Sequence, residues 1–282
     1  MLKIGEINDL EVKRKTDIGY MLTDGTEDVF LHFNETNHRE LKDGEKVLAF
    51  LYYDNKARMA ATLSEPLITL EKKGFVKVKE INKEMGVFVD NGISKDMLVS
   101  KDYLPYDFDR WPKKEDTLYC ILKHKNRLTA KPLNKFDVEG NEDIKLVVSD
   151  RVDAYVIHVG PEGYNLVSVD KQLIFVHITQ TREQLRMGQK VNVRIQRVNP
   201  FDYNGSLTET KEKVMDVDAQ MLYDYIKENI KIPFTSDSKP EDILATFGLS
   251  KKAFKRALGR LYSERKIIFE DDHTVLVEGE AS

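Results

Sequence analysis

A segment in which a phenylalanine, a second apolar residue and a histidine follow one another occurs twice in the chain, 145 positions apart in the numbering (177 − 32). The two copies are Phe30-Leu31-His32 and Phe175-Val176-His177. Each copy follows a glycine-aromatic pair and precedes a Gly-x-x-Val segment: Gly19-Tyr20 and Gly44–Val47 in one case, Gly163-Tyr164 and Gly188–Val191 in the other. A middle copy fits between them as Gly86–Val89, Met97–Ser100 and Asp116–Leu122. Such internal repetition indicates one domain type used three times.

Residues 1 to 64 contain short apolar segments separated by turn residues. The expected strands are Lys3–Asn8, Glu11–Lys15, Gly19–Leu22, Asp28–Phe33, Lys46–Tyr53 and Met59–Leu63. Asp24-Gly25 and Asp54-Asn55 supply turns, because Gly and Asn tolerate the left-handed backbone that tight turns need. Short strands without a long helix are typical of a small sandwich or barrel, and five strands in a partly open barrel form the oligonucleotide/oligosaccharide-binding (OB) fold.

The second and third units follow the same strand order. The second has expected strands at Phe75–Lys79, Gly86–Asp90, Asp96–Val99, Leu118–Lys123 and Arg127–Pro132, and the third runs from Ile144 to about Leu207. An inserted loop, Tyr103–Pro112, is rich in aromatic residues. Stacking on bases is one role for it, but we favour packing against a neighbouring repeat, since exposed aromatic clusters without a partner are costly.

From Asp216 the apolar spacing changes to that of an amphipathic helix, with Met221, Leu222, Tyr225, Ile226 and Ile230 on one face. A second helix is expected with Ser238 as its cap and Pro240 in its first turn, ending at Gly248. Ser250 caps a third helix that carries Phe254, Leu258 and Leu261. Lys266–Phe269 and Thr274–Val277 then form a hairpin, so this end of the chain is predicted to be a winged helix.

The predicted fold class is therefore mainly β with a small α/β end: three tandem OB-fold barrels followed by a winged-helix domain. The predicted domains are 1–64, 65–135 and 136–215 for the barrels and 216–282 for the winged helix.

Composition restricts the classes of function. No run of 18 apolar residues and no signal-like amino terminus is present, so neither a membrane span nor secretion is expected, and a cytoplasmic location follows. The single cysteine, Cys120, cannot form an intramolecular disulfide and lies in an apolar run typical of a core. Phosphate-binding loops, zinc-protease motifs and zinc-deaminase spacings are not found, so we predict no enzyme, no cofactor and no metal.

The net charge of −4 argues against a protein that coats nucleic acid by bulk attraction. Only residues 65–135 are basic overall, with 15 Lys and Arg against 11 Asp and Glu. The expected third helix adds a concentrated set of cations for which the sequence offers few acidic partners; these are Lys251, Lys252, Lys255, Arg256 and Arg260. Three- and four-residue spacing places Lys252, Lys255, Arg256 and Arg260 on one side of that helix.

The repeats resemble the RNA-binding domain first described in ribosomal protein S-one. In that domain one strand has the pattern aromatic-Gly-x-aromatic-Val, the next ends in Leu-Val-His-Ile-Ser, and the last hairpin has Asp-x-x-x-Arg. The first repeat matches at His32, Asp54 and Arg58, the second at Phe88 and Arg127, and the third at His177. The other positions differ from this pattern. In the first repeat, Ile18 and Met21 stand at the aromatic positions. In the second, Met85 replaces the other aromatic residue and Val99 replaces the histidine, and in the third Asn165 stands at the second aromatic position.

Three such repeats followed by a winged helix resemble the conserved virulence factor B family of bacterial regulatory RNA-binding proteins. The resemblance implies that His32, Phe88 and His177 supply faces on which bases stack, while Arg58 and Arg127 contact phosphates or stack through their guanidinium groups. We expect Phe30, Phe33 and Phe175 in the core. Each assignment has a plainer alternative: a barrel histidine, a solvated Asp54–Arg58 hairpin pair, or a solvated lysine-rich helix face.

The sequence therefore predicts a non-catalytic regulator that binds single-stranded RNA through the barrels and the basic helix. The ribosome and the transcription machinery are further candidate partners, no membrane partner is expected, and a monomer is favoured. Two alternatives remain: a DNA-binding regulator led by the winged helix, and an interaction scaffold associated with the ribosome or a polymerase.

Overall fold

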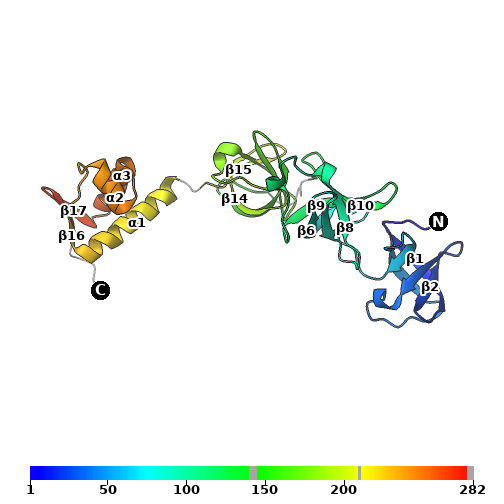
Figure 1. The fold of residues 1–282 in the computed structure, drawn as a ribbon. Helices are drawn as coiled ribbons and strands as arrows, with labels where there is room; N and C mark the ends of the chain where they lie inside the picture. The colour runs from blue at the N-terminus through cyan, green and yellow to red at the C-terminus, as the bar shows by residue number, and fades with distance from the viewer. Residues whose placement is uncertain (140–144, 209–210, 278–282) are drawn as a thin grey trace. The chain divides into compact units, whose positions relative to one another are not determined.

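The computed structural model describes residues 1–139, 145–208 and 211–277, which fall into two compact units, Met1–Leu207 and Thr208–Ser282. The first unit contains three five-stranded sheets and the second a helical domain with a small sheet (Figure 1). The predicted fold class, three OB-type barrels and a winged helix, is confirmed. Within the described ranges, no helix is long and apolar enough to cross a membrane.

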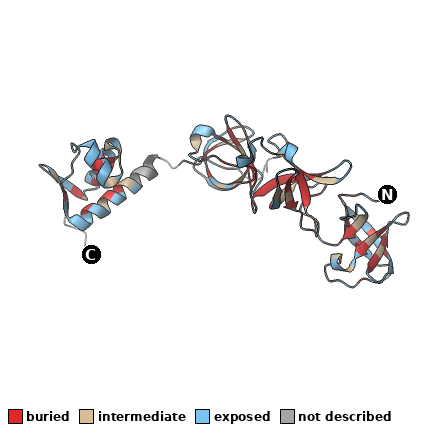
Figure 2. Ribbon diagram, in the orientation of Figure 1, coloured by how far each residue is buried: buried red, intermediate tan, exposed pale blue. Residues whose placement is uncertain are grey.

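The first barrel closes in the order β1-β2-β3-β5-β4, with β3 and β5 parallel. Its strands are β1 (Ile7–Lys15), β2 (Gly19–Thr23), β3 (Asp28–His32), β4 (Lys46–Tyr53) and β5 (Met59–Thr62), and the 3₁₀ helix η1 (Phe33–Glu35) follows β3. Alternate strand residues such as Val12, Leu22 and Leu31 form its core, as the period of two requires. Figure 2 shows in red that buried residues lie along the strands of the barrels.

Our division of the first segment into two strands was wrong. The side chain of Asn8 accepts from the Lys3 backbone N–H and donates to the Lys3 and Glu6 carbonyls, which holds residues 3–6 in a turn. The chain then continues as the single strand β1, whose pairing with β2 shifts between Val12 and Arg14. Such a bulge bends a strand and lets it stay paired around a barrel.

The second barrel has the strand order β10-β9-β6-β7-β8, and β8 lies against β10. Its elements are β6 (Gly74–Asn82), β7 (Gly86–Asp90), β8 (Met97–Ser100), η2 (Lys101–Tyr103), η3 (Phe108–Arg110), β9 (Thr117–His124) and β10 (Leu128–Pro132). Cys120 is fully buried in this core, as predicted, and burial raises the pKa of its thiol. It is therefore a packing residue.

The third barrel closes in the same strand order as the first. Its elements are β11 (Arg151–Val159), β12 (Gly163–Ser168), β13 (Leu173–His177), η4 (Ile178–Gln180), β14 (Lys190–Val198) and β15 (Tyr203–Ser206). The predicted start of this unit, Ile144, lies outside the described residues.

Consecutive barrels share buried residues. Phe50 and Tyr52 of β4 belong to the same core cluster as the second barrel. Tyr119 of β9 packs with Ile157 and Val167 of the third barrel. The Asp116 carboxylate, one residue before β9, also accepts from the guanidinium of Arg186. The second and third barrels are thus joined by both apolar packing and a charged pair.

The second unit contains α1 (Lys211–Asn229), β16 (Lys231–Ile232), α2 (Pro240–Phe247), α3 (Lys251–Ser263), β17 (Ile267–Glu270) and β18 (His273–Leu276). Leu222 and Ile226 of α1 are buried against Phe254 and Leu258 of α3. Met221, Tyr225 and Ile230, which we expected on the same apolar face, remain exposed.

Most of the predicted helix ends are present. Pro240 occupies the first turn of α2, Gly248 ends it with φ 67°, and the Ser250 hydroxyl caps α3 by accepting from the Ala253 N–H. The capping role of Ser238 was wrong. Lys239 is the cap residue of α2, because the Ser238 hydroxyl instead accepts from the Thr235 N–H in the preceding turn.

Candidate nucleic-acid interface

The three barrels share one outer position, where the last residue of a strand lies opposite a glycine. His32 pairs with Gly19, Ser100 with Gly86 and His177 with Gly163. A Cβ at any of these glycines would collide with a carbonyl oxygen of the facing strand. The close approach explains why glycine recurs in every repeat.

Each of these strand-ending residues also caps the 3₁₀ helix that follows it. His32 Nδ1 accepts from the Asn34 N–H at 3.1 Å, and His177 Nδ1 accepts from the Thr179 N–H at 3.3 Å. A neutral imidazole whose Nδ1 accepts carries its proton on Nε2. Both histidines are exposed, and because the cap occupies Nδ1 of each ring, Nε2 is the ring nitrogen available to a ligand.

We define the outer face of each barrel by this cap residue and the two side chains next to it on the same side of the sheet. The faces are Met21, Phe30 and His32 in the first barrel, Phe88, Leu98 and Ser100 in the second, and Asn165, Phe175 and His177 in the third. In each face, the two residues other than the cap residue lie directly opposite each other on neighbouring strands. These pairs are Met21 with Phe30, Phe88 with Leu98, and Asn165 with Phe175. The faces therefore differ in chemistry but share one geometry.

The register corrects one of our assignments. Val99 does not take the place of the histidine in the second barrel; it is fully buried in the core. Ser100 faces Gly86 and caps η2 through its hydroxyl, at 3.4 Å from the Asp102 backbone nitrogen. Because side chains alternate along a strand, a shift of one residue moves an assignment from the outer face to the core.

Phe30 and Phe175 are outer-face residues, so our prediction that they lie in the core was wrong. Both are half-buried, and their ring centroids lie 6.3 and 6.4 Å from those of His32 and His177, respectively. The period of two could have revealed them, since each stands two residues before the histidine. Phe33, in contrast, packs against the first core as predicted.

Phe88, the predicted aromatic residue of the second barrel, is half-buried on its outer face opposite Leu98. With Ser100 at the cap position, this face lacks the aromatic and histidine pair found in the other two barrels.

Arg58 and Arg127 occupy the same place in their barrels, one residue before the last strand, and both are exposed. Arg58 donates from both Nε and an Nη to Asp54 Oδ2, at 2.9 and 2.7 Å. The other oxygen of Asp54 accepts from the backbone N–H groups of Lys56 and Arg58. These hydrogen bonds, first the one from the Arg58 backbone, lower the pKa of Asp54 to about 2. Asp54 thus holds the turn and aims Arg58.

The third barrel has no arginine at this turn. Asn199 donates to Asp202 and to Asn204, the latter lying next to Phe175 on the parallel strand. Its outer face is therefore polar and amide-rich, with His158 Nδ1 3.5 Å from the Asn165 amide nitrogen.

The cations of α3 are more heavily paired than the sequence indicated. Lys255 lies 3.8 Å from the Asp237 carboxylate, and Arg260 donates to Glu264 at 2.8 Å. Lys251 Nζ donates to the Asp237 carbonyl. In the described part of the chain, Lys252 and Arg256 are exposed and have no recorded ion pair. These two, one helical turn apart, are the cations of α3 best placed for a phosphate.

An exposed aromatic pair beside α3 escaped the sequence analysis. Tyr262, at the end of α3, stacks on Phe269 of β17 with ring centroids 5.2 Å apart and an interplanar angle of 26°. Both rings remain largely exposed. Their positions are separated by a turn, so no periodic pattern in the sequence links them.

The comparisons with known proteins agree with this architecture. Residues 4–64 match a model of the S1 domain, residues 73–131 a model of the CvfB first S1-like domain, and residues 220–276 a model of the CvfB-like winged helix domain. The chain is 32% identical to conserved virulence factor B of Staphylococcus saprophyticus, over 98% of this chain and 95% of that protein. The chain belongs to the conserved virulence factor B family.

Other relatives of this family match over nearly the whole chain. YitL of Bacillus subtilis is 34% identical, over 97% of this chain and 93% of the relative, and conserved virulence factor B of Staphylococcus aureus (strain USA300) is 30% identical, over 98% and 94%. A crystal structure from Streptococcus pneumoniae, described as a multidomain protein with nucleic acid binding domains, aligns with a TM-score of 0.65 and 28% identity. It covers 97% of this chain and 98% of its own. S1-like and winged-helix domains are both nucleic-acid-binding types.

Proposed function

We propose that this member of the conserved virulence factor B family is a cytoplasmic, non-catalytic regulator that binds single-stranded RNA and controls gene expression after transcription. The outer faces of the first and third barrels are the main contact sites. The observation that carries the proposal is the repeated geometry of Phe30 with His32 and of Phe175 with His177.

Base stacking supports this assignment. An aromatic platform on an OB-type barrel is worth about 1–3 kcal/mol per base and tolerates any sequence, because every base has a π face. Each pair combines a half-buried phenylalanine with an exposed imidazole whose free Nε2–H can donate to a base or phosphate. A duplex keeps its base faces stacked inside, so these surfaces suit a single strand.

The cations are distributed over other parts of the chain. Arg58 and Arg127 stand one residue before the last strands of the first two barrels, and Lys252 and Arg256 lie on α3. The arrangement supports shared binding, in which the barrels contact bases and scattered cations contact phosphates. We propose the ribosome and the transcription machinery as further partners of such a regulator.

The test is fluorescence anisotropy with a labelled, unstructured RNA, repeated over a salt series, with duplex DNA as competitor. We expect binding at low salt, a log–log salt slope that reflects phosphate contacts, and weaker competition by the duplex. Phe175→Ala should weaken binding about fivefold or more, the low end of one stacking contact. Phe136→Ala, an equally bulky change at an exposed phenylalanine of the linker before the third barrel, is the matched control.

Two results would redirect the assignment. Better competition by duplex DNA would favour a winged-helix DNA-binding regulator. Co-sedimentation with ribosomes without binding to isolated RNA would favour an interaction scaffold.

A further inference from the structure

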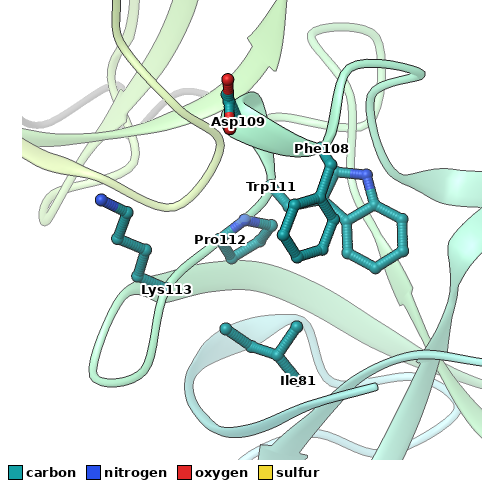
Figure 3. Close-up of a pocket in the computed structure, with 6 residues that line it drawn as sticks. All are labelled: Ile81, Phe108, Asp109, Trp111, Pro112 and Lys113. Carbon is teal, nitrogen blue, oxygen red and sulfur yellow. The ribbon is translucent and has the colours of Figure 1, made fainter. Parts of the chain in front are cut away.

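The inserted loop of the second barrel borders an open-sided pocket of about 240 Å³, and the lining contains no residue of the outer face. Figure 3 shows the residues that line it, and they come from the loop and from β6: Ile81, Phe108, Asp109, Trp111, Pro112 and Lys113. Pockets for drug-sized ligands are about 300–1,000 Å³, so this volume suits a single small ring system.

The pocket has a rigid frame. Trp111 is buried, as our packing prediction for the loop requires, and its indole N–H donates to the Pro105 carbonyl at 2.7 Å. The Asp107 carboxylate caps η3 by accepting from the Asp109 N–H. The Arg110 carbonyl of the same loop accepts from the backbone N–H of Met187, which belongs to the third barrel. These hydrogen bonds fix the loop residues around the pocket in position.

One wall is an exposed aromatic ring. Phe108 lies with its ring centroid 5.1 Å from that of Trp111 and is 39% exposed. The Lys83 ammonium lies 4.4 Å from the Phe108 centroid and comes from the turn between β6 and β7. The strand that follows this turn, β7, carries Phe88 of the outer face.

The rim carries both a hydrogen-bond acceptor and a cation. The side chains of Asp109 and Lys113 are exposed, and in the described residues neither has a recorded ion pair. Both charged side chains therefore line the same pocket as the Phe108 ring.

We propose that this pocket binds one unpaired nucleobase of the RNA strand. The Lys83 ammonium moves off the Phe108 ring and the base stacks in its place, an exocyclic amine donates to the Asp109 carboxylate, and the neighbouring phosphates lie near Lys83 and Lys113. Carboxylates accept from the amine of cytosine in known nucleic-acid complexes, and aromatic rings hold bases by stacking. The inference rests on the proposed RNA function and adds a second type of contact to it.

Trp111 is the only tryptophan of the chain, so its emission reports on the pocket directly. An unlabelled cytidine decamer is titrated into the full-length protein while tryptophan emission is recorded. Overall binding is followed separately by the anisotropy of the fluorescein-labelled decamer. We expect saturable quenching of Trp111 with the same midpoint as the anisotropy change.

Phe108→Ala should abolish the quenching and weaken binding at least about fivefold, the low end of one base stack. Tyr106→Ala, a fully exposed aromatic of the same loop outside the pocket lining, should change neither. Asp109→Asn keeps the size of an exposed side chain and should also weaken binding of the cytidine decamer. This second variant does not depend on whether the fold tolerates the loss of the Phe108 ring.

The outcomes separate the two proposals. Anisotropy that saturates while Trp111 emission stays constant would overturn the pocket and leave RNA binding intact. Equal affinities for the Phe108→Ala, Asp109→Asn and Tyr106→Ala proteins would do the same. No change in either signal would remove both the pocket and the proposed function.

Discussion

The pair between Asp116 and Arg186 should determine how firmly the second and third barrels are joined. Arg186 Nε donates to Asp116 Oδ2 at 2.7 Å and an Nη donates to Oδ1 at 2.8 Å, a two-pronged geometry. The Asp116 side chain is 9% exposed and that of Arg186 26%. The cost of removing one partner should therefore be closer to that of breaking a buried ion pair than to that of breaking an exposed one.

These distances and exposures set the expected magnitude. Removing one partner of a buried pair costs about 3–5 kcal/mol, whereas exposed pairs contribute about 0.2–1 kcal/mol. Arg186→Ala leaves the Asp116 carboxylate with the Lys113 backbone N–H at 2.7 Å, which offsets part of the loss. Allowing also for the partial exposure of Arg186, we expect a loss of about 2–4 kcal/mol in the free energy of unfolding.

Urea unfolding followed by Trp111 emission provides the assay. Trp111 belongs to the core cluster of the second barrel, whereas Arg186 follows β13 of the third, so a shift in the Trp111 transition reports on the junction. With an m-value of about 2 kcal/mol/M, the midpoint should fall by roughly 1–2 M. Arg182→Ala, at an exposed arginine of the same loop, should change the midpoint little.

A double-mutant cycle isolates the pair itself. Asp116→Ala, Arg186→Ala and the combined variant should give a coupling energy of about 1.5–3 kcal/mol, as expected for hydrogen bonds between charged groups. A coupling below about 0.5 kcal/mol would show that the apolar contacts of Tyr119, Ile157 and Val167 join the barrels without the ion pair.

Three further predictions concern other parts of the chain. Gly188→Ala should cost about 1 kcal/mol more stability in urea unfolding than Gly44→Ala, because both have φ +79° but only at Gly188 would a Cβ lie 3.1 Å from side chains of the second barrel. Cys120 should not react with a thiol reagent in the native protein and should react after unfolding, since burial raises its pKa. Replacing Lys252 and Arg256 by Ala should reduce the salt slope of RNA binding by about 1.4, from about 0.7 per phosphate contact.

The fold could be predicted from the sequence because its signals are local and repeated. Turn residues, the alternation of buried and exposed residues in strands, and Gly248 at the end of α2 each determine the structure of only a few neighbouring positions. We divided the first strand wrongly because the Asn8 side chain forms hydrogen bonds with the backbone carbonyls of Lys3 and Glu6, and no periodic pattern in the sequence indicates such a turn.

The candidate site was harder to predict because it depends on register. Val99 and Ser100 are adjacent in sequence, but one is in the core and the other caps η2. Phe30 and Phe175 appeared apolar enough for a core, yet pairing with Met21 and Asn165 places them outside.

Contacts between distant segments were beyond reach of any sequence pattern. Asp237 pairs with Lys255 of α3, which appeared unpaired, and Tyr262 meets Phe269 across a turn. Each depends on how helices and strands pack, which spacing within one element does not encode.

Photocrosslinking of a 4-thiouridine RNA to the full-length protein, followed by peptide mapping, tests the central claim most directly. We predict adducts on the peptides that contain Phe30 and His32 and on those that contain Phe175 and His177. Adducts confined to α3 and the hairpin of the winged helix, with none on either barrel face, would contradict the account.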